Sequence, residues 1–275
     1  MSVGGCPGPR FIPPSNCFLS EEINVIHKKL ALAALALSLA APALHAAEGQ
    51  AVANPVDPET VAALKRMGAY LQTLQRFEVK AARTTETVLA DGQKLQNSAV
   101  AETQVHRPNK LRLTTWRGKN QKDLVYDGKT VTLYTSALKY YASAETANTI
   151  AGMVGQLNER YGIEFPMADL FRWGTDAAPV DKLESAMNAG QDLVGQHVCN
   201  HYAFRQEQID WQLWIRDGDQ PLPCKIVITD RSDEARPQSV SVLNWNLKPS
   251  FKDAVFKFTP PKDAKRIGIR PLDTN

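Results

Sequence analysis

The chain has 275 residues, of which 43% are hydrophobic and 22% are charged, and its formal net charge is +3. This composition is typical of a globular protein, and the near balance of charges gives no support for nucleic-acid binding. The length allows one good core or one large β domain once a targeting segment is removed.

Residues 25–46 are predicted to be a cleavable signal peptide. The basic group His27-Lys28-Lys29 precedes an apolar run from Leu30 to Ala41, and mostly small residues continue to Ala46. This order is typical of secretion signals, and the run is shorter than the about 20 apolar residues that a membrane helix needs. We therefore expect cleavage after Ala46 and a location in the periplasm of a Gram-negative envelope; an uncleaved anchor is the alternative.

The remaining boundaries follow from composition. Residues 1–24 are rich in Gly and Pro and precede the basic group. We expect them to be a mis-annotated start or a disordered segment. Residues 47–275 hold neither an internal repeat nor a low-complexity linker, so they are expected to form a single domain and a monomer.

The first element of the mature chain is predicted to be a helix of about 16 residues. Asp57-Pro58 supplies an N-cap followed by a proline at the first helical position. Apolar residues then recur at spacings of three and four: Val61, Leu64, Met67, Leu71 and Leu74. Such a stripe packs on one face of a sheet.

From Phe77 onward the hydrophobic period changes to two, which indicates strands. Asp91-Gly92 and Asp127-Gly128 separate such runs and favour type I′ hairpin turns. Pro108 marks the end of another strand, because proline has no N–H to donate. The six predicted strands are Phe77–Leu89, Lys94–Val105, Leu111–Trp116, Leu124–Tyr126, Val131–Tyr134 and Tyr140–Ala142.

A helical insertion is predicted next. Its first helix spans Thr146–Tyr161 and ends at Gly162, and a shorter one begins at Pro166 and ends at Gly174. Two glycines inside the first helix weaken it by roughly 1 kcal/mol each. A soft, apolar insertion between two sets of strands is what a movable cover requires, and a plain core-packing connection is the alternative.

The rest of the chain is again rich in strands, all of them expected to be antiparallel. With the first six they make about eleven, and a sheet of that size tends to curl or close. The sequence therefore predicts a mainly β (α+β) fold. The five further strands are Val198–Gln206, Trp211–Ile215, Ile226–Ile228, Val240–Leu247 and Val255–Phe258.

Two cysteines, Cys199 and Cys224, remain in the mature chain. The two residues could form a disulfide in an exported protein, because its compartment is oxidising. Their predicted strands are separated by a third strand, about 10 Å in all, whereas bridged Cα atoms lie within about 7 Å. The alternative is two small buried thiols.

The sequence holds few signs of catalysis. It lacks the Gly-x-Ser-x-Gly, His-Glu-x-x-His and phosphate-loop motifs. His197 and His201 alternate with Cys199 on one strand but lie about 13 Å apart along it, too far to chelate one metal. We expect no enzyme activity, no metal and no cofactor.

A basic run follows Arg107. These residues could bind anionic lipid head groups or an acidic partner protein. The simpler interpretation is that they form the exposed face of a hairpin. The run comprises Lys110, Arg112, Arg117, Lys119 and Lys122.

Three short motifs occur in a fixed order: His106-Arg107-Pro108-Asn109, Tyr126-Asp127-Gly128-Lys129, and Phe256-Lys257-Phe258-Thr259-Pro260. Together they resemble the periplasmic lipoprotein-carrier (LolA-like) superfamily. The mature chain as a whole is more similar to a related family of predicted periplasmic proteins of unknown function.

This resemblance implies a half-open, eleven-stranded antiparallel barrel around an apolar cavity, with an N-terminal helix and a helical lid. In the carrier family the arginine of the Arg-Pro-Asn motif holds the lid closed, and Arg107 matches it. The expected lid and ligand residues are Arg107, Met153, Leu157, Leu170 and Phe171.

The sequence thus predicts a periplasmic binding protein or carrier for a lipid, an acylated protein or another apolar ligand, with an envelope or outer-membrane protein as a further partner. The alternative is an interaction or sensing module that uses the same surface without catalysis. A hydrolase with an unrecognised site is the third candidate.

Overall fold

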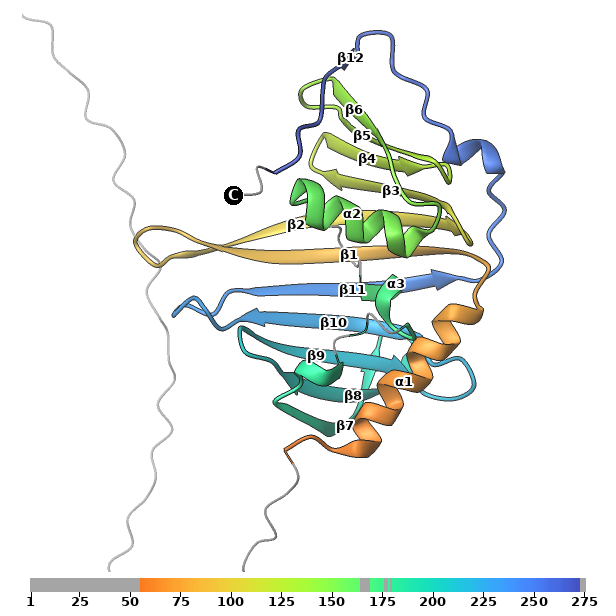
Figure 1. The fold of residues 1–275 in the computed structure, drawn as a ribbon. Helices are drawn as coiled ribbons and strands as arrows, with labels where there is room; N and C mark the ends of the chain where they lie inside the picture. The colour runs from red at the N-terminus through yellow and green to blue at the C-terminus, as the bar shows by residue number, and fades with distance from the viewer. Residues whose placement is uncertain (1–54, 164–168, 176–177, 179, 273–275) are drawn as a thin grey trace, which may run out of the picture. The chain divides into compact units, whose positions relative to one another are not determined.

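The computed structural model describes residues 55–163, 169–175, 178 and 180–272. Within them the chain forms one curved sheet of twelve strands, drawn in Figure 1. The expected mainly β fold with an N-terminal helix and a helical insertion is confirmed. The predicted signal peptide, residues 25–46, lies outside the described residues.

Six strands precede the helical insertion and six follow it. The first six are β1 (Arg76–Val88), β2 (Lys94–His106), β3 (Lys110–Arg117), β4 (Asn120–Tyr126), β5 (Thr130–Thr135) and β6 (Tyr140–Glu145). The second six are β7 (Ser185–Val194), β8 (His197–Arg205), β9 (Ile209–Arg216), β10 (Pro223–Asp230), β11 (Gln238–Asn246) and β12 (Lys265–Arg266).

The strand order is β12-β6-β5-β4-β3-β2-β1-β11-β10-β9-β8-β7. Strands β1 to β6 and strands β7 to β11 therefore each form a meander, and the two meanders meet where β1 pairs with β11. All pairs are antiparallel except β12 with β6, which is parallel. This order places β7 at one edge of the sheet and the short β12 at the other.

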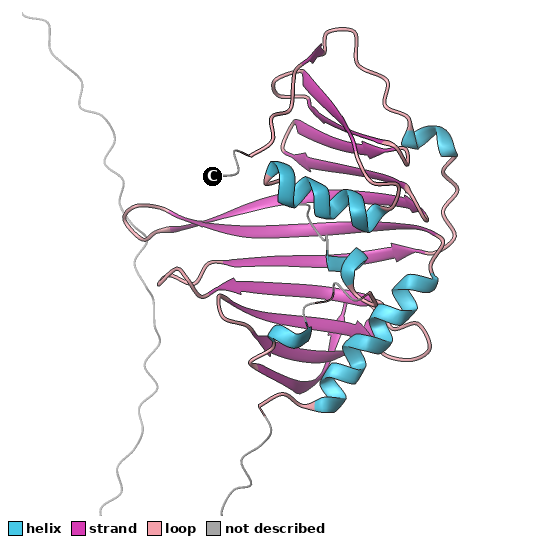
Figure 2. Cartoon of the chain, in the orientation of Figure 1, coloured by secondary structure: helices cyan, strands magenta, loops and turns pink. Residues whose placement is uncertain are grey.

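Three helices lie over one face of the sheet, here called the helix face (Figure 2). They are α1 (Pro58–Thr73), α2 (Ile150–Tyr161) and α3 (Asp169–Arg172). The Asp57 carboxylate caps α1 by accepting from the amides of Glu59 and Thr60, as predicted. Among the described residues, none of the helices is long and apolar enough to span a bilayer.

Two single turns of 3-10 helix complete the chain. They are η1 (Val180–Lys182), which precedes β7, and η2 (Asp253–Phe256), which follows β11. Phe256 of η2 is buried.

The core lies between the helices and the helix face. Leu64, Met67 and Leu71 of α1 are buried together with strand residues such as Val105 and Tyr126. Each fully buried aliphatic side chain contributes roughly 1.5–3 kcal/mol. The α1 stripe found in the sequence is thus the surface that attaches this helix to the sheet.

The α1 helix and the end of α3 approach each other through two glycines. A Cβ on Gly68 would lie 2.4 Å from the Gly174 nitrogen, so neither position has room for a side chain. Gly174 also has a φ of +80°, which disfavours other residues. The Gln72 side chain donates to the Trp173 carbonyl at 2.7 Å beside this contact.

The strand predictions need three corrections. Val255–Phe258 was predicted to be a strand, but η2 covers its first two residues. The aromatic rings of Phe256 and Phe258 anchor the segment without ladder pairing. β7 was not predicted because most of its side chains are exposed and its apolar residues do not alternate with polar ones. β12 was missed because it has two residues.

The predicted type I′ turns are wrong. Only the glycine of each Asp-Gly pair has a positive φ, +85° at Gly92 and +103° at Gly128, whereas a type I′ turn needs two such residues. The Asp127 carboxylate instead accepts from the amides of Lys129 and Thr130 at 3.0 and 2.8 Å. This local hydrogen bonding closes a longer loop.

Candidate functional site

An apolar cleft of about 590 Å³ lies beside β6, the strand next to the short edge strand β12, and we call it the strap cleft. Strands β3, β4 and β5 form its floor, and the C-terminal segment forms one wall. Its main apolar lining residues are Leu113, Leu124, Leu133, Tyr140, Ile163 and Ile267. Because these side chains are aliphatic or aromatic, the cleft suits hydrocarbon.

Residues 262–272, here named the C-terminal strap, run along this cleft. The Lys265 amide donates to the Lys139 carbonyl at 2.8 Å, and the Ile267 amide donates to the Tyr141 carbonyl of β6 at 2.9 Å. The Leu272 amide donates to the Arg160 carbonyl at 2.8 Å. The Leu272 side chain also contacts the Gly162 position at the end of α2. The strap thus connects the sheet edge to the helical insertion.

A second cleft of about 1010 Å³ lies near α3, and we call it the tryptophan cleft. The Trp211 ring stacks on Phe204 at 4.0 Å and lies 5.7 Å from the Trp173 ring. The Trp211 indole N–H is buried and has no hydrogen-bond partner among the described residues. The lining also includes Ile226 and Ile228.

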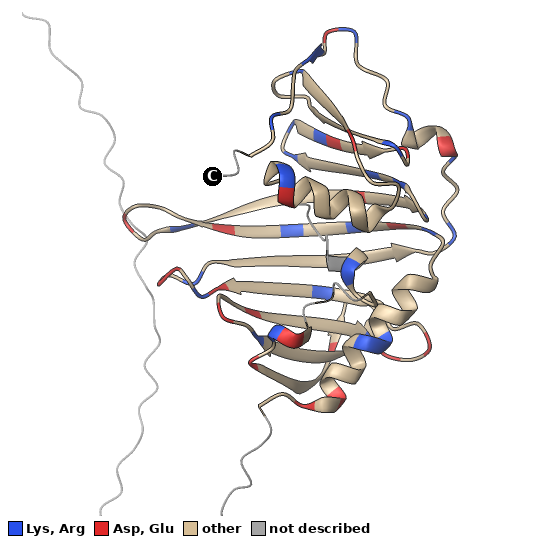
Figure 3. Cartoon of the chain, in the orientation of Figure 1, with Lys and Arg blue, Asp and Glu red and all other residues tan. Residues whose placement is uncertain are grey.

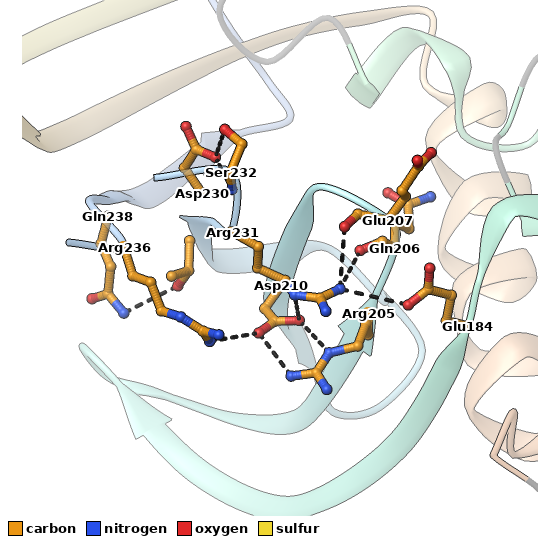
Figure 4. A network of polar contacts seen from close by, with 11 residues as sticks. Glu184, Arg205, Gln206, Glu207, Asp210, Asp230, Arg231, Ser232, Arg236 and Gln238 are labelled. Atoms are coloured by element: carbon orange, nitrogen blue, oxygen red, sulfur yellow. Dashed lines mark hydrogen bonds and ion pairs between the residues drawn. The ribbon is translucent and has the colours of Figure 1, made fainter. Parts of the chain in front are cut away.

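The rim of the tryptophan cleft is polar and tied together by Arg231 (Figure 4). Its guanidinium donates to the carbonyls of Gln206 and Glu207 at 2.8 and 3.3 Å and lies 3.5 Å from the Glu184 carboxylate. These contacts hold the loop between β8 and β9 in one conformation, so the rim of the cleft is well ordered.

Asp210 anchors the same network. It accepts two hydrogen bonds from Arg205, at 2.7 and 3.0 Å, which lower the pKa of its carboxyl group. Because the folded-state pKa is lowered, the stabilisation is present above the ordinary aspartate pKa and is lost as the pH falls through the lowered value.

Arg107, the residue singled out in the sequence, lies at the end of α1. Its guanidinium donates to the carbonyls of Leu74 and Leu71 at 3.1 and 3.4 Å and lies 5.9 Å from the centre of the Phe171 ring. The last turn of α1 holds no basic residue. Arg107 therefore supplies the cation that helix carbonyl ends favour.

The hydrogen-bond partners of Arg107 are backbone carbonyls and not a carboxylate. Burial lowers the pKa of its guanidinium, which nevertheless stays charged because its ordinary pKa is so high. Glu159, Glu164 and Asp169 of the helical insertion are the acids that could pair with Arg107, but its side-chain hydrogen bonds go to backbone carbonyls. Glu164 and the Asp169 side chain lie outside the described residues.

The predicted cover residues Met153, Leu157 and Phe171 are buried in the core. They line neither the strap cleft nor the tryptophan cleft. The side chain of Leu170 lies outside the described residues. In this conformation the insertion packs as core, and its role as a cover stays a prediction.

A family described as "Predicted periplasmic protein (DUF2092)" matches residues 60–270. The chain belongs to the DUF2092 family. The match covers the whole sheet and places this DUF2092 protein in the periplasm, as the sequence led us to expect. None of the curated proteins matches the chain.

Several solved structures are similar to this DUF2092 protein at low identity. LprF from Mycobacterium bovis is 14% identical with a TM-score of 0.41, covering 77% of this chain and 100% of that one. Lipoprotein LppX from Mycobacterium tuberculosis is 10% identical with a TM-score of 0.38, covering 71% and 98%. A LolA superfamily protein from Nitrosomonas europaea is 8% identical with a TM-score of 0.34, covering 72% and 97%.

The two cysteines of this DUF2092 protein lie on the face opposite the helices. Cys199 of β8 and Cys224 of β10 belong to one small buried cluster with Trp214, and both are free thiols. A bulge between Pro223 and Lys225 leaves Cys224 outside the regular register. As expected, β9 lies between the two strands.

We expect both thiols to resist alkylation in the folded protein. Burial, followed by the neighbouring Cys224, raises the pKa of the Cys199 thiol to about 12, and only thiolates react quickly. Iodoacetamide labelling at pH 8, read by mass spectrometry, should add nothing before denaturation. Labelling after denaturation in the absence of reductant serves as the control, because it labels only free thiols. Fast labelling of the native protein would contradict the expectation.

Proposed function

We propose that this protein is a periplasmic binding protein or carrier for a lipid, an acylated protein or another apolar ligand. The observation that carries the proposal is the strap cleft, whose walls are largely aliphatic and aromatic. Its volume of about 590 Å³ falls in the range of about 300–1,000 Å³ usual for ligand sites. Each ligand methylene buried there contributes about 0.8 kcal/mol, so hydrocarbon needs little directional chemistry.

The helical insertion is the proposed cover. α2 lies between the sheet and solvent, and its C-terminal end contacts the strap. Movement of α2 and α3 would enlarge the space available on the helix face. Arg107 opposes that movement in this proposal, because it joins the end of α1 to Phe171 of α3.

The polar rim of the tryptophan cleft favours the second candidate, an envelope interaction module without catalysis. Its lining mixes charged and amide side chains with the two tryptophans. A protein chain could dock there through hydrogen bonds and aromatic contacts. Binding assays on the strap cleft separate the two functions.

The first test is whether a ligand is present at all. Native mass spectrometry of protein purified from the periplasm should show a bound lipid or acylated molecule. A dansyl-labelled fatty acid should also bind the delipidated protein with increased fluorescence. Failure of both would overturn the proposal.

Filling the strap cleft should prevent binding of that probe. Thr115 lines the cleft on β3, and Thr115→Trp is expected to weaken probe binding at least about tenfold, or 1.4 kcal/mol. Fluorescence titration measures the effect, with circular dichroism as a check on folding.

The matched control is Thr84→Trp on β1, a half-buried threonine that lines neither cleft. It should leave the affinity unchanged. Equal binding by wild type and Thr115→Trp would place the ligand elsewhere.

A further inference from the structure

The C-terminal strap carries an unusual concentration of positive charge. Residues 262–272 hold four cations and one acid, a net charge of +3, which equals the formal net charge of the whole chain. The rest of the protein is therefore neutral overall. The four cations are Lys262, Lys265, Arg266 and Arg270.

These cations are exposed, and Figure 3 shows them in blue along the last part of the chain. The single acid, Asp263, pairs with Lys139 of the neighbouring loop at 2.6 Å. Lys139 thus offsets the one negative charge, and the potential around the strap stays positive.

The other basic run of the sequence is different. Lys110 lies 2.6 Å from the Asp253 carboxylate, and Arg112 lies 3.2 Å from the Asp123 carboxylate. Acids within the fold thus offset two of the five cations of that run. The strap is therefore the better candidate for an anionic partner.

Apolar side chains lie among the strap cations. Ile267 is 48% exposed and Leu272 is 55% exposed, and Leu138 of the adjoining loop is 65% exposed. Leu138 and Ile267 also line the strap cleft, so exposed hydrocarbon continues from the surface into it.

We propose that the C-terminal strap is a docking surface for an anionic lipid bilayer, which it contacts through its exposed cations and through Ile267 and Leu272. Interleaved cations and aliphatic side chains suit the boundary between head groups and acyl chains. An acidic protein or free phosphate would use the cations but would leave the aliphatic side chains in water. Docking would bring the mouth of the strap cleft to the lipid.

This inference goes beyond the proposed function and does not depend on it. Docking requires only the strap and its surface charge, whereas ligand binding requires the interior of the cleft. Thr115→Trp should therefore dock normally, and failure of docking would leave the fatty-acid binding results untouched.

The experiment is flotation of the mature protein with vesicles. Vesicles of phosphatidylcholine with one third phosphatidylglycerol should carry the protein, and vesicles of phosphatidylcholine alone should not. Raising the salt to about 0.5 M should release it, because that shortens the screening length. Inorganic phosphate at matched ionic strength should not compete.

Charge reversal tests the strap itself. Each cation near an anionic surface contributes about fivefold in affinity, so Lys262→Glu with Arg270→Glu should weaken binding at least about 25-fold. Lys65→Glu with Arg66→Glu changes the same charge at exposed positions of α1 and is the matched control.

The control should keep most of the binding. Equal losses in the two double variants, equal binding to neutral vesicles, or absence of binding to anionic vesicles would each overturn the proposal. Ile267→Ser adds a second arm, because it keeps every charge and should still weaken binding to anionic vesicles.

Discussion

Replacing Arg107 with methionine is expected to speed release of a bound dansyl-labelled fatty acid about tenfold while the sheet stays folded. The guanidinium makes two hydrogen bonds to the end of α1 and lies over the Phe171 ring. Hydrogen bonds from charged groups contribute about 1.5–3 kcal/mol each. Destabilising the closed state by only about 1.4 kcal/mol would make release about ten times faster. Stopped-flow fluorescence measures the release rate.

The control for this variant is Arg160→Met. Arg160 lies on α2, 5.6 Å from the centre of the Tyr161 ring, so the substitution removes a similar cation from a similar contact. Arg107→Lys should be intermediate, since lysine keeps the charge but not the planar fork. If Arg107→Met and Arg160→Met release the probe at the wild-type rate, Arg107 does not hold the cover.

Gly68→Ala is expected to lower the free energy of unfolding by about 1 kcal/mol. The new Cβ would lie 2.4 Å from the Gly174 nitrogen and 2.9 Å from backbone carbons, so α3 must move. Overpacking of this kind costs about 1–3 kcal/mol and exceeds the gain in helix propensity of about 1 kcal/mol. Urea unfolding followed by tryptophan fluorescence gives the value.

Gly155→Ala is expected to change the free energy of unfolding in the opposite direction. Gly155 lies within α2, and a Cβ there would meet nothing within 4 Å. It should raise the free energy of unfolding by about 1 kcal/mol through helix propensity. A Gly68→Ala protein as stable as Gly155→Ala would show that α1 and α3 are not in tight contact.

Local patterns in the sequence predicted most of the elements. The apolar stripe and the Asp57 cap specified α1, and Gly162, with a φ of +62°, ended α2 as expected. These signals depend on residues a few positions apart, so periodicity and capping rules detect them. The strand end before Pro108 was correct for the same reason.

Contacts between distant segments were not predictable. Nothing local to Gly68 indicates that Gly174 lies against it, and nothing local to Ile267 indicates that it faces Leu124 across a cleft. Arg107 was singled out by its motif, but its contacts with Leu71 and Leu74 depend on how α1 is placed on the sheet. The candidate site is therefore mostly a product of tertiary packing.

The pairing of β1 with β11 has a consequence for biogenesis. β1 pairs readily with β2, its neighbour in the sequence. Its other side must wait for Gln238–Asn246, the last of the long strands in the sequence. Bringing such remote partners together is slow. During that interval a 13-residue strand presents an open edge to other chains, so the newly exported protein is most exposed to aggregation before its two meanders join.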